Sequence, residues 1–229
     1  MKQSPFISYD HPNYLKLLGD ETQSKSLATF LLNYSHKLLE SSLPKNVYKK
    51  VIEVGSGKGI HYEYVSKNFD TYLMTDLSNN FSDCKRKYFK DIRNQTLKFD
   101  CQNASELSYM DNRFDRLIAV HVLEHLVDPV SVLTECNRVV KDSGIISLVL
   151  PCDPGILWRL GRHFGPRKRG INNGIEYDYQ QAAEHVNAIF NLVVFIKYHF
   201  EVLSDQWFPS RLPFPDINLF YICHIKVKK

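Results

Sequence analysis

Apolar residues along this chain follow two patterns, short segments rich in apolar residues and longer segments with three- and four-residue spacing. The short segments predict strands, and they fall at residues 51–54, 71–76, 97–101, 115–120, 145–150, 199–203 and 219–226. The helical spacing predicts helices at residues 22–43, from residue 60 onward, and at residues 81–88 and 129–140. An unbroken apolar run such as 145–150 is typical of a parallel strand that is buried on both faces.

Two segments show neither pattern. Residues 1 to about 20 carry prolines and scattered aromatics, so an irregular arm is expected, which together with the first helix forms an N-terminal arm and lid over residues 1–46. Residues 152–190 contain several glycines and a cluster of arginines and lysine, and we expect them to be mostly irregular, with one or two helical turns at 156–160. Because so long a connection is usually functional, this segment is predicted to be an insertion on the substrate side.

The first strand ends in the glycine loop Gly55-Ser56-Gly57-Lys58-Gly59. Glycine tolerates positive φ and lets a ligand approach the backbone, and the helix expected after the loop would offer unpaired N–H groups. A phosphate-binding P-loop needs Ser or Thr after Gly-Lys, whereas Gly59 follows Lys58 here. The dinucleotide fingerprint has the spacing G-x-G-x-x-G, which also differs from this loop. The loop therefore predicts a site for a nucleotide-like cofactor.

An acidic residue ends the second predicted strand. Asp76 lies about twenty residues after the glycine loop, a separation at which a carboxylate can accept two hydrogen bonds from a ribose diol. Nicotinamide-dependent enzymes use the same device, so Asp76 by itself leaves S-adenosylmethionine (SAM) and NAD as alternatives.

Together these features resemble the class I SAM-dependent methyltransferases. The motifs that carry the resemblance occur in the family's order, namely Glu53 before the glycine loop, Asp76, the loop Asn103-Ala104, and the turn Met110–Asp115 into the fourth strand. The resemblance implies an α/β fold, a Rossmann-like seven-stranded and mostly parallel sheet flanked by helices, with the last strand antiparallel and an N-terminal helical lid.

The resemblance also implies that SAM is the cofactor. Residues expected to border its methionine part are Glu53, Gly55, Ser56, Gly57 and Gly59, with Asp76 at the ribose, Asn103 and Ala104 at the adenine, and His121 beside the methyl group. Leu77, next to Asp76, is also expected to contact the cofactor. The family commonly has an acid where Asn103 stands, and an amide oxygen can still accept a hydrogen bond from the adenine amino group.

The second half of the chain is similar to methyltransferases of bacterial surface-polysaccharide biosynthesis. The similarity rests on Pro151-Cys152, on Trp158–Arg162, on Tyr177–Tyr179 and on Glu184–Asn187. It implies a small-molecule acceptor, a sugar or glycolipid precursor that is phosphorylated or nucleotide-linked.

The basic cluster of this half is open to two interpretations, a solvated loop or an anion clamp. Because arginine binds phosphate bidentately, the clamp interpretation predicts acceptor binding by Arg162, Arg167, Arg169 and Tyr177. If the acceptor is a hydroxyl, a positioned base speeds its deprotonation, and the candidate catalytic bases are His121, His185 and Asp178.

The sequence His121-Val122-Leu123-Glu124-His125 matches a zinc signature, H-x-x-E-H. Two histidines four residues apart bind one zinc ion only if they share a face of one helix. His121 directly follows a predicted strand, so the pair is expected to straddle a strand end and a turn. We predict no metal site, and a structural hydrogen bond for His125.

Composition narrows the class of protein. The 229 residues, 44% of them apolar, suit a single domain spanning residues 1–229, and the net charge of +4 does not indicate a nucleic-acid binder. Five scattered cysteines predict free thiols in a reducing, cytoplasmic compartment, and no apolar run is long enough to span a bilayer. Two further functions stay open, a non-catalytic regulatory protein that binds SAM and an NAD-dependent enzyme.

Overall fold

The computed structural model describes residues 26–93 and 96–229, and its centre is a seven-stranded sheet in the order β3-β2-β1-β4-β5-β7-β6. The strands are β1 (Lys50–Val54), β2 (Thr71–Asp76), β3 (Leu97–Cys101), β4 (Phe114–Val120), β5 (Val140–Pro151), β6 (Glu201–Pro209) and β7 (Asn218–Lys226). Strands β1 to β5 pair in parallel, and β7 runs antiparallel to both of its neighbours. The predicted Rossmann-like sheet, mostly parallel with its last strand antiparallel, is confirmed.

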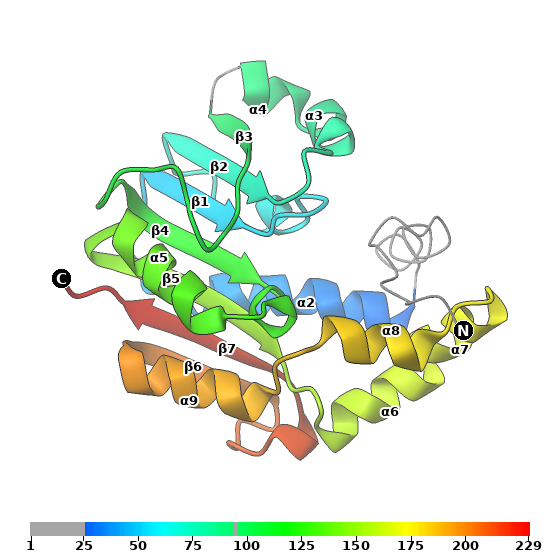
Figure 1. Ribbon diagram of the computed structural model, residues 1–229. Helices are drawn as coiled ribbons and strands as arrows, with labels where there is room; N and C mark the ends of the chain where they lie inside the picture. The colour runs from blue at the N-terminus through cyan, green and yellow to red at the C-terminus, as the bar shows by residue number, and fades with distance from the viewer. Residues whose placement is uncertain (1–25, 94–95) are drawn as a thin grey trace, which may run out of the picture.

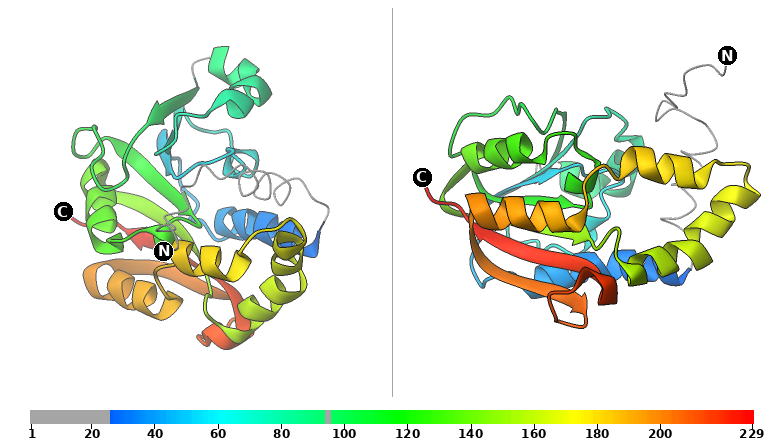
Figure 2. Two further views of the ribbon diagram at one scale, coloured as in Figure 1. Left: turned by 45° about the vertical axis from the view of Figure 1, so that its right-hand side comes forward. Right: turned by 60° about the horizontal axis from the view of Figure 1, so that its bottom comes forward.

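Helices cover both faces of this sheet (Figure 1). The helices are α2 (Leu27–Ser41), α3 (Ser82–Lys87), α4 (Phe89–Arg93), α5 (Pro129–Val139), α6 (Ile156–Phe164), α7 (Pro166–Asn172), α8 (Tyr177–Glu184) and α9 (Ile189–His199), with 3₁₀ turns η1 (His61–Glu63), η2 (Leu123–His125) and η3 (Pro215–Ile217). Helix α2 lies on one face and α5 and α9 on the other, while α6, α7 and α8 extend beyond the carboxyl ends of the parallel strands (Figures 1 and 2).

The two-residue period of the strands divides the apolar side chains between two cores. In β4, Leu117 and Ala119 face the core that α5 and α9 complete, and Ile118 faces the core on the α2 side. Because β1, β4 and β5 are covered on both faces, nearly every position in them is buried. This burial explains the unbroken apolar runs of the sequence.

One side chain on the α2 face of β4 is charged. Arg116 is 1% exposed, and it donates to both carboxylate oxygens of Glu40 on α2, at 2.6 and 3.1 Å. Its Nε atom also donates to Ser147 Oγ on β5 at 3.0 Å. A buried guanidinium is tolerated only when it is paired and hydrogen-bonded, so this pair ties α2 to the middle of the sheet.

Three histidines extend the network. His61 Nε2 lies 3.0 Å from Glu40 Oε1, and His36 Nδ1 lies 3.0 Å from His61 Nδ1. On the other side, His224 bridges Ser147 and Ser42, with both ring nitrogens at 3.0 Å from a hydroxyl oxygen. Although burial by itself raises the pKa of Glu40, its hydrogen bond to His61 and the charge of Arg116 lower that pKa to about 2. Burial, followed by the charge of Arg116, lowers the pKa of His224 to about 4.

The first predicted helix is present as α2, which ends at Ser41, two residues before the predicted end. Helix α2 begins after Ser26, whose hydroxyl accepts from the Thr29 amide at 3.2 Å. The expected arm over residues 1 to about 20 lies outside the described residues. Within the described part of the chain, no helix is both long and apolar enough to cross a bilayer.

The prediction of a helix directly after the glycine loop is wrong. Only the single 3₁₀ turn η1 forms there, because the apolar residues of this segment pack around an aromatic cluster instead of along one helical stripe. The Tyr62 ring meets the rings of Phe69, Tyr72 and Tyr88 at centroid distances of 6.0, 5.0 and 4.9 Å. The glycine loop therefore lacks the helix N-terminus that its sequence predicted.

The prediction that residues 152–190 are mostly irregular is also wrong, since α6, α7 and α8 form there. Gly165 separates α6 from α7, and Pro166 begins α7 at a position where proline is favoured. Gly161 lies inside α6, so this glycine does not end the helix. Helix α9 was not predicted, and the expected strand at 199–203 begins instead at Glu201 and continues to Pro209.

We expect Glu40→Gln to lower the free energy of unfolding by about 3–5 kcal/mol, because removing one partner leaves the Arg116 charge buried and unpaired. Chemical denaturation of the wild type and the variant measures this loss. Glu201→Gln is the matched control, since Glu201 pairs with Lys228 at the surface, and an exposed pair contributes at most about 1 kcal/mol. Equal losses for the two variants would contradict the role given to Glu40.

We also expect stability to fall in mild acid through His224. Below its unfolded pKa of about 6.5 the unfolded chain binds a proton that the folded chain, with a pKa of about 4, does not bind. The folded state is therefore destabilised by about 1.5 kcal/mol between pH 6.5 and pH 5. Denaturation of His224→Asn across this range should show a loss smaller by that amount than in the wild type. The exposed His199→Asn is the control, and parallel curves for His224→Asn and the wild type would refute the expectation.

Candidate functional site

The glycine loop joins β1 to η1 at the carboxyl edge of the sheet. Gly55, Gly57 and Gly59 have φ angles of +66°, +48° and +66°, which side chains with a Cβ rarely adopt. A Cβ on Gly55 would lie 2.5 Å from Val122 Cγ2, and one on Gly59 would lie 2.9 Å from Met74 Cε. A Cβ on Gly57 would meet no described atom within 4 Å. Two of the glycines thus allow close packing, and the third faces open space that a ligand can enter.

Asp76 ends β2 next to this loop. Its Oδ2 atom accepts from the Gly57 amide at 2.9 Å, and its Oδ1 atom accepts from the Ser78 amide at 3.0 Å. Leu77, which follows, has 76% of its surface exposed. The Gln102 amide donates to the Asp76 carbonyl at 2.9 Å, so the end of β3 lies alongside.

Asn103 and Ala104 continue that edge after β3. The Asn103 amide oxygen accepts from the amide and the hydroxyl of Ser105, at 3.1 and 2.9 Å, while Ala104 is half-buried. The predicted cofactor residues of the first three strands therefore meet at one edge of the sheet, as expected for the carboxyl ends of parallel strands.

The floor of the glycine loop is polar and buried. Glu53 is buried, and Tyr72 donates its hydroxyl to Glu53 Oε2 at 2.7 Å. Burial raises the pKa of Glu53 to about 8, so this carboxyl group changes charge near neutral pH. The buried Ser56 hydroxyl has no hydrogen-bond partner among the described residues. A polar ligand group at the loop would give this hydroxyl a partner.

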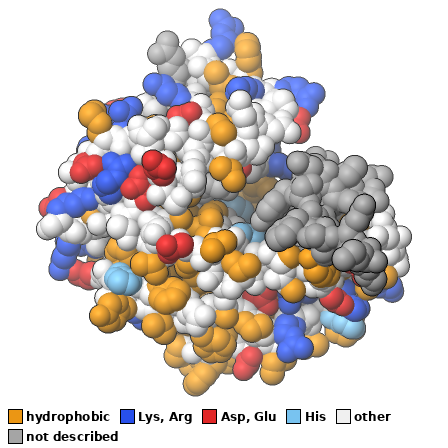
Figure 3. Space-filling model, in the orientation of Figure 1, with side chains coloured by type: hydrophobic (Ala, Val, Ile, Leu, Met, Phe, Trp, Pro, Cys, Tyr) orange, Lys and Arg blue, Asp and Glu red, His pale blue; other side chains and the backbone are white. Residues whose placement is uncertain are grey.

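A cavity of about 730 Å³, called the inner cavity here, opens beside the loop between α2, α6, α8 and the ends of β4 and β7. Its walls are mainly apolar, and they include Leu31, Leu32, Ile60, Trp158, Phe164 and Phe220. Its polar residues include His36, His121, Glu124, His125 and His185. In Figure 3, histidine surface is visible in a hollow near the centre of the face, among hydrophobic side chains.

His121 lies directly after β4, with a φ angle of +56° that is uncommon for a residue other than glycine. Its Nε2 atom lies 3.1 Å from Ser35 Oγ on α2. Burial, followed by the charges of His125 and His185, lowers the pKa of His121 to about 3. His121 is therefore neutral at physiological pH.

Glu124 and His125 follow on the 3₁₀ turn η2. Glu124 is 2% exposed, and burial raises its pKa to about 8. His125 Nδ1 lies 3.1 Å from the Glu184 carbonyl oxygen, and burial, followed by the charge of His185, lowers its pKa to about 4. The Asn187 side chain donates to the carbonyls of Leu123 and Leu126, the first at 3.1 Å, and so fixes the turn.

The zinc-like signature therefore spans a strand end and a 3₁₀ turn instead of one α-helix. The described residues contain no group of three or more His, Cys, Asp or Glu side chains placed to hold a metal ion.

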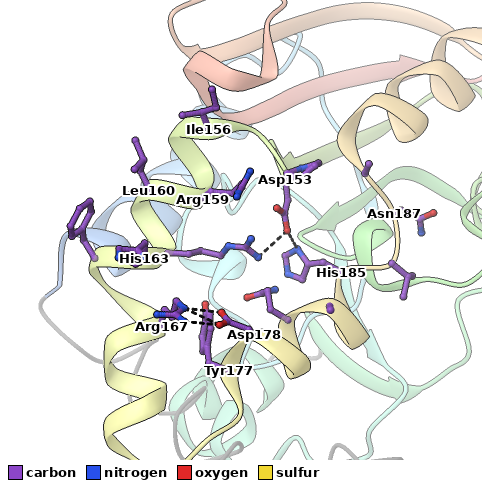
Figure 4. Close-up of a pocket in the computed structure, with 17 residues that line it drawn as sticks. Asp153, Ile156, Arg159, Leu160, His163, Arg167, Tyr177, Asp178, His185 and Asn187 are labelled. Atoms are coloured by element: carbon purple, nitrogen blue, oxygen red, sulfur yellow. Dashed lines mark hydrogen bonds and ion pairs between the residues drawn. The ribbon is translucent and has the colours of Figure 1, made fainter.

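A second cavity of about 880 Å³, the outer cavity, lies on the other side of α6 and α8. At its base Arg162 donates to Asp153 Oδ2 at 3.0 Å, and His185 Nδ1 lies 2.8 Å from the same oxygen (Figure 4). Further out, Arg167 makes a bidentate ion pair with Asp178, with its shortest contact at 2.6 Å (Figure 4). These carboxylates balance both arginine charges.

The predicted acceptor residues divide between the two cavities. Arg162, Tyr177 and His185 line both, Arg169 lines only the inner cavity, and Arg167 and Asp178 line only the outer one. The predicted base Asp178 is therefore in a different cavity from His121. Sequence reasoning gave no site role to Ser35, to Trp158 or to Glu124, although the motifs Trp158–Arg162 and His121–His125 already included the last two.

Comparisons with known proteins agree with the sheet and the glycine loop. Residues 52–148 match the family model described as a methyltransferase domain. The uncharacterized protein MJ0638 of Methanocaldococcus jannaschii is 31% identical over 144 residues, which are 62% of this chain and 55% of that protein. The ubiquinone biosynthesis O-methyltransferase of Actinobacillus pleuropneumoniae is 29% identical over 104 residues, 43% of this chain and 44% of that enzyme. The chain thus spans about half the length of these curated relatives.

Solved structures share the whole fold. The N-methyltransferase NodS of Bradyrhizobium japonicum, in complex with S-adenosylhomocysteine (SAH), superposes with a TM-score of 0.63 and 11% identity over 95% of this chain and 99% of that one. At such low identity this likeness shows the fold alone.

Proposed function

We propose that this protein transfers a methyl group from SAM to a small-molecule acceptor bound in the inner cavity. The observation that carries the proposal is the position of Gly57, which faces open space and is tied to Asp76 by a 2.9 Å hydrogen bond. Ile60, directly after the glycine loop, lines the inner cavity together with His121. The contact between Val122 and Gly55 puts the end of β4 against the glycine loop. A cofactor in the loop and an acceptor in the cavity would then be neighbours.

The residues at the sheet edge fit SAM. The unpaired Ser56 hydroxyl and the buried Glu53 suit the polar methionine part, the Asp76 carboxylate suits the ribose, and the exposed Leu77 suits an adenine face. Asn103 and Ala104 would then border the adenine edge. When bound, SAM supplies a methyl group whose carbon bonds to the acceptor atom as the carbon–sulfur bond breaks and its electron pair stays on sulfur. The protein's own contribution is to align the two partners.

The inner cavity favours one of the predicted acceptors. Leucine, phenylalanine and tryptophan walls suit a molecule with a large apolar part, so a glycolipid precursor fits them better than a free sugar. The segment 152–190 supplies α6 and α8 as walls, which supports its predicted substrate role. An acceptor phosphate or nucleotide would have to displace Asp153 or Asp178 from Arg162 or Arg167. Polysaccharide biosynthesis stays a proposal that rests on the sequence resemblance.

The three predicted bases are not equivalent. Asp178 is occupied by Arg167 in the outer cavity, and His185 lies in the wall between the cavities, paired with Asp153. His121 lines only the inner cavity, and its neighbour Val122 packs against Gly55 of the glycine loop. We therefore assign proton transfer to the part of the inner cavity around His121. The five cysteines are free thiols, which supports the predicted reducing cytoplasm.

Calorimetric titration with SAM, SAH and NAD tests the proposal. We expect SAM and SAH to bind and NAD not to bind, and mass spectrometry of metabolites incubated with the protein and SAM to show a product heavier by one methyl group. Tight binding of NAD without binding of SAM would overturn the proposal. Binding of SAM without methylation of any metabolite would instead favour a regulatory protein.

We expect Asp76→Ala to weaken SAM binding by about 1.5–3 kcal/mol, the scale of a hydrogen bond to a charged group. The carboxylate would be lost both to the ribose and to the Gly57 amide, which it holds at 2.9 Å. Calorimetry measures the affinity. Asp70→Ala, at the exposed residue directly before β2, is the control. An Asp76→Ala variant that binds SAM as tightly as the wild type would remove Asp76 from the site.

We expect Gly161→Phe to fill part of the inner cavity and to raise the Michaelis constant for the acceptor at least about tenfold. The added ring would displace an apolar part of the acceptor, and burial of an apolar group of this size contributes about 1.5–3 kcal/mol. A Cβ on Gly161 meets no described atom within 4 Å, and this residue lines the inner cavity. The substitution replaces a poor helix former within α6. SAM affinity should stay unchanged, and Gly161→Ala, which adds only a methyl group at the same position, is the control. An unchanged Michaelis constant would move the acceptor out of the inner cavity.

A further inference from the structure

Hydrogen-bond partners determine where the proton lies on His121. The Ser35 hydroxyl has one hydrogen, which it donates to the Leu32 carbonyl at 2.6 Å. Toward His121 Nε2, 3.1 Å away, Ser35 can therefore only accept. Nε2 of the neutral His121 must carry the ring proton, and Nδ1 is left with a free lone pair.

The same reasoning applies to His125. Its Nδ1 atom lies 3.1 Å from the Glu184 carbonyl oxygen, which can only accept a hydrogen bond. Because burial keeps this imidazole neutral, Nδ1 carries the only ring proton and Nε2 is an acceptor. The two histidines therefore both direct their proton-free nitrogens to the side where Glu124 lies.

Glu124 lies between these nitrogens. Its Oε1 atom is 3.7 Å from His121 Nδ1 and 3.7 Å from His125 Nε2, which is too long for a direct hydrogen bond. Its Oε2 atom is buried and has no hydrogen-bond partner among the described residues. We call these three side chains of the inner cavity the acceptor floor. Two imine nitrogens and a carboxyl group gather there, and no side-chain N–H group of the described residues donates a hydrogen bond to any of them.

We propose that the reactive group of the methyl acceptor is a primary or secondary amine, held as an ammonium by His121, Glu124 and His125. The inference rests on the proposed function and specifies its substrate class. A primary ammonium brings three N–H donors and a positive charge, which match two lone pairs and a buried carboxylate. A hydroxyl brings one donor and would leave at least one of these buried acceptors unpaired, which is costly.

The acceptor floor also takes up the proton that the ammonium must lose before methyl transfer. An ammonium N–H bond breaks, the proton bonds to a Glu124 carboxylate oxygen, and the electron pair stays on nitrogen as the lone pair that accepts the methyl group. After transfer the nitrogen is again cationic, and Glu124 releases its proton to water as the product leaves. Burial raises the pKa of Glu124 to about 8 in the empty site, and the positive charge of a bound ammonium favours the ionised carboxylate. Because the raised pKa is also closer to that of an amine, the proton exchange is nearly balanced. Ser35 and Asn187 are positioning residues, since they orient His121 and the turn η2.

Calorimetry with hexylamine and 1-hexanol tests the proposal, at pH 7.5 and both with and without SAH. The two probes share an apolar chain and differ in the head group. We expect the wild type to bind hexylamine at least about tenfold more tightly than 1-hexanol, the scale of one hydrogen bond to a charged group. Equal affinities for the two probes would overturn the proposal.

Glu124→Gln keeps the size of the side chain and removes its charge. We expect the preference for the amine to fall to within about twofold, while SAH affinity and the melting temperature confirm that the site is folded. Glu176→Gln, an exposed position at the start of α8, is the matched control and should keep the preference.

Ser35→Ala provides a second variant that leaves the carboxyl group in place. It removes the acceptor for His121 Nε2–H, so the ring proton can move to Nδ1 and turn an acceptor of the floor into a donor. We expect hexylamine affinity to fall at least about threefold. If the preference for the amine is unchanged in both Glu124→Gln and Ser35→Ala, the acceptor floor does not bind the amine and the proposal is refuted. Failure of SAH to bind refutes the proposed function instead, and the probe titrations without SAH still report on the floor.

Discussion

The site depends on a buried ion pair that joins α2 to the centre of β4. Arg116 points from the centre of β4 into a core where an unpaired charge would not be tolerated, and Glu40 of α2 supplies its counter-charge. That pairing fixes the rotation and height of α2 on the sheet. One and a half turns before Glu40, the same helix brings Ser35 to His121. The tautomer of a histidine in the cavity is thus set by a helix that an arginine holds in place.

Most of the sheet could be predicted from the chain because its signals are local. The buried strands β1, β4 and β5 read as apolar runs, and the alternation with helices indicated parallel pairing. The glycine loop and Asp76 were recognisable for the same reason, since each lies within one strand-to-loop junction. The convergence of Gly57, Asp76 and Asn103 on one edge followed from the parallel topology.

What could not be predicted depends on tertiary contacts. The segment after the glycine loop has helix-like spacing, but only one 3₁₀ turn forms there. Tyr62 of this turn packs against the aromatic rings of Phe69, Tyr72 and Tyr88. The glycines in α6 and before α7 led to the prediction of an irregular segment. One of them, Gly161, lies inside the helix and leaves space beside the inner cavity. The roles of the arginines were also hidden, because Asp153 and Asp178 neutralise them only in the folded chain. In the same way, the lone pairs of His121 and His125 become visible only with their partners.

The contact of Gly55 with Val122 has a consequence for how this fold can diverge. The space that a side chain at position 55 would need is filled by Val122, 2.5 Å from where its first carbon would stand, and the neighbour of Val122 is His121. Descendants of this chain that accept new compounds are therefore expected to vary in α6 and α8, which can change without disturbing the loop. Substitutions at the end of β4 would alter cofactor binding and acceptor binding together. They would therefore need compensating substitutions both in the glycine loop and in the inner cavity.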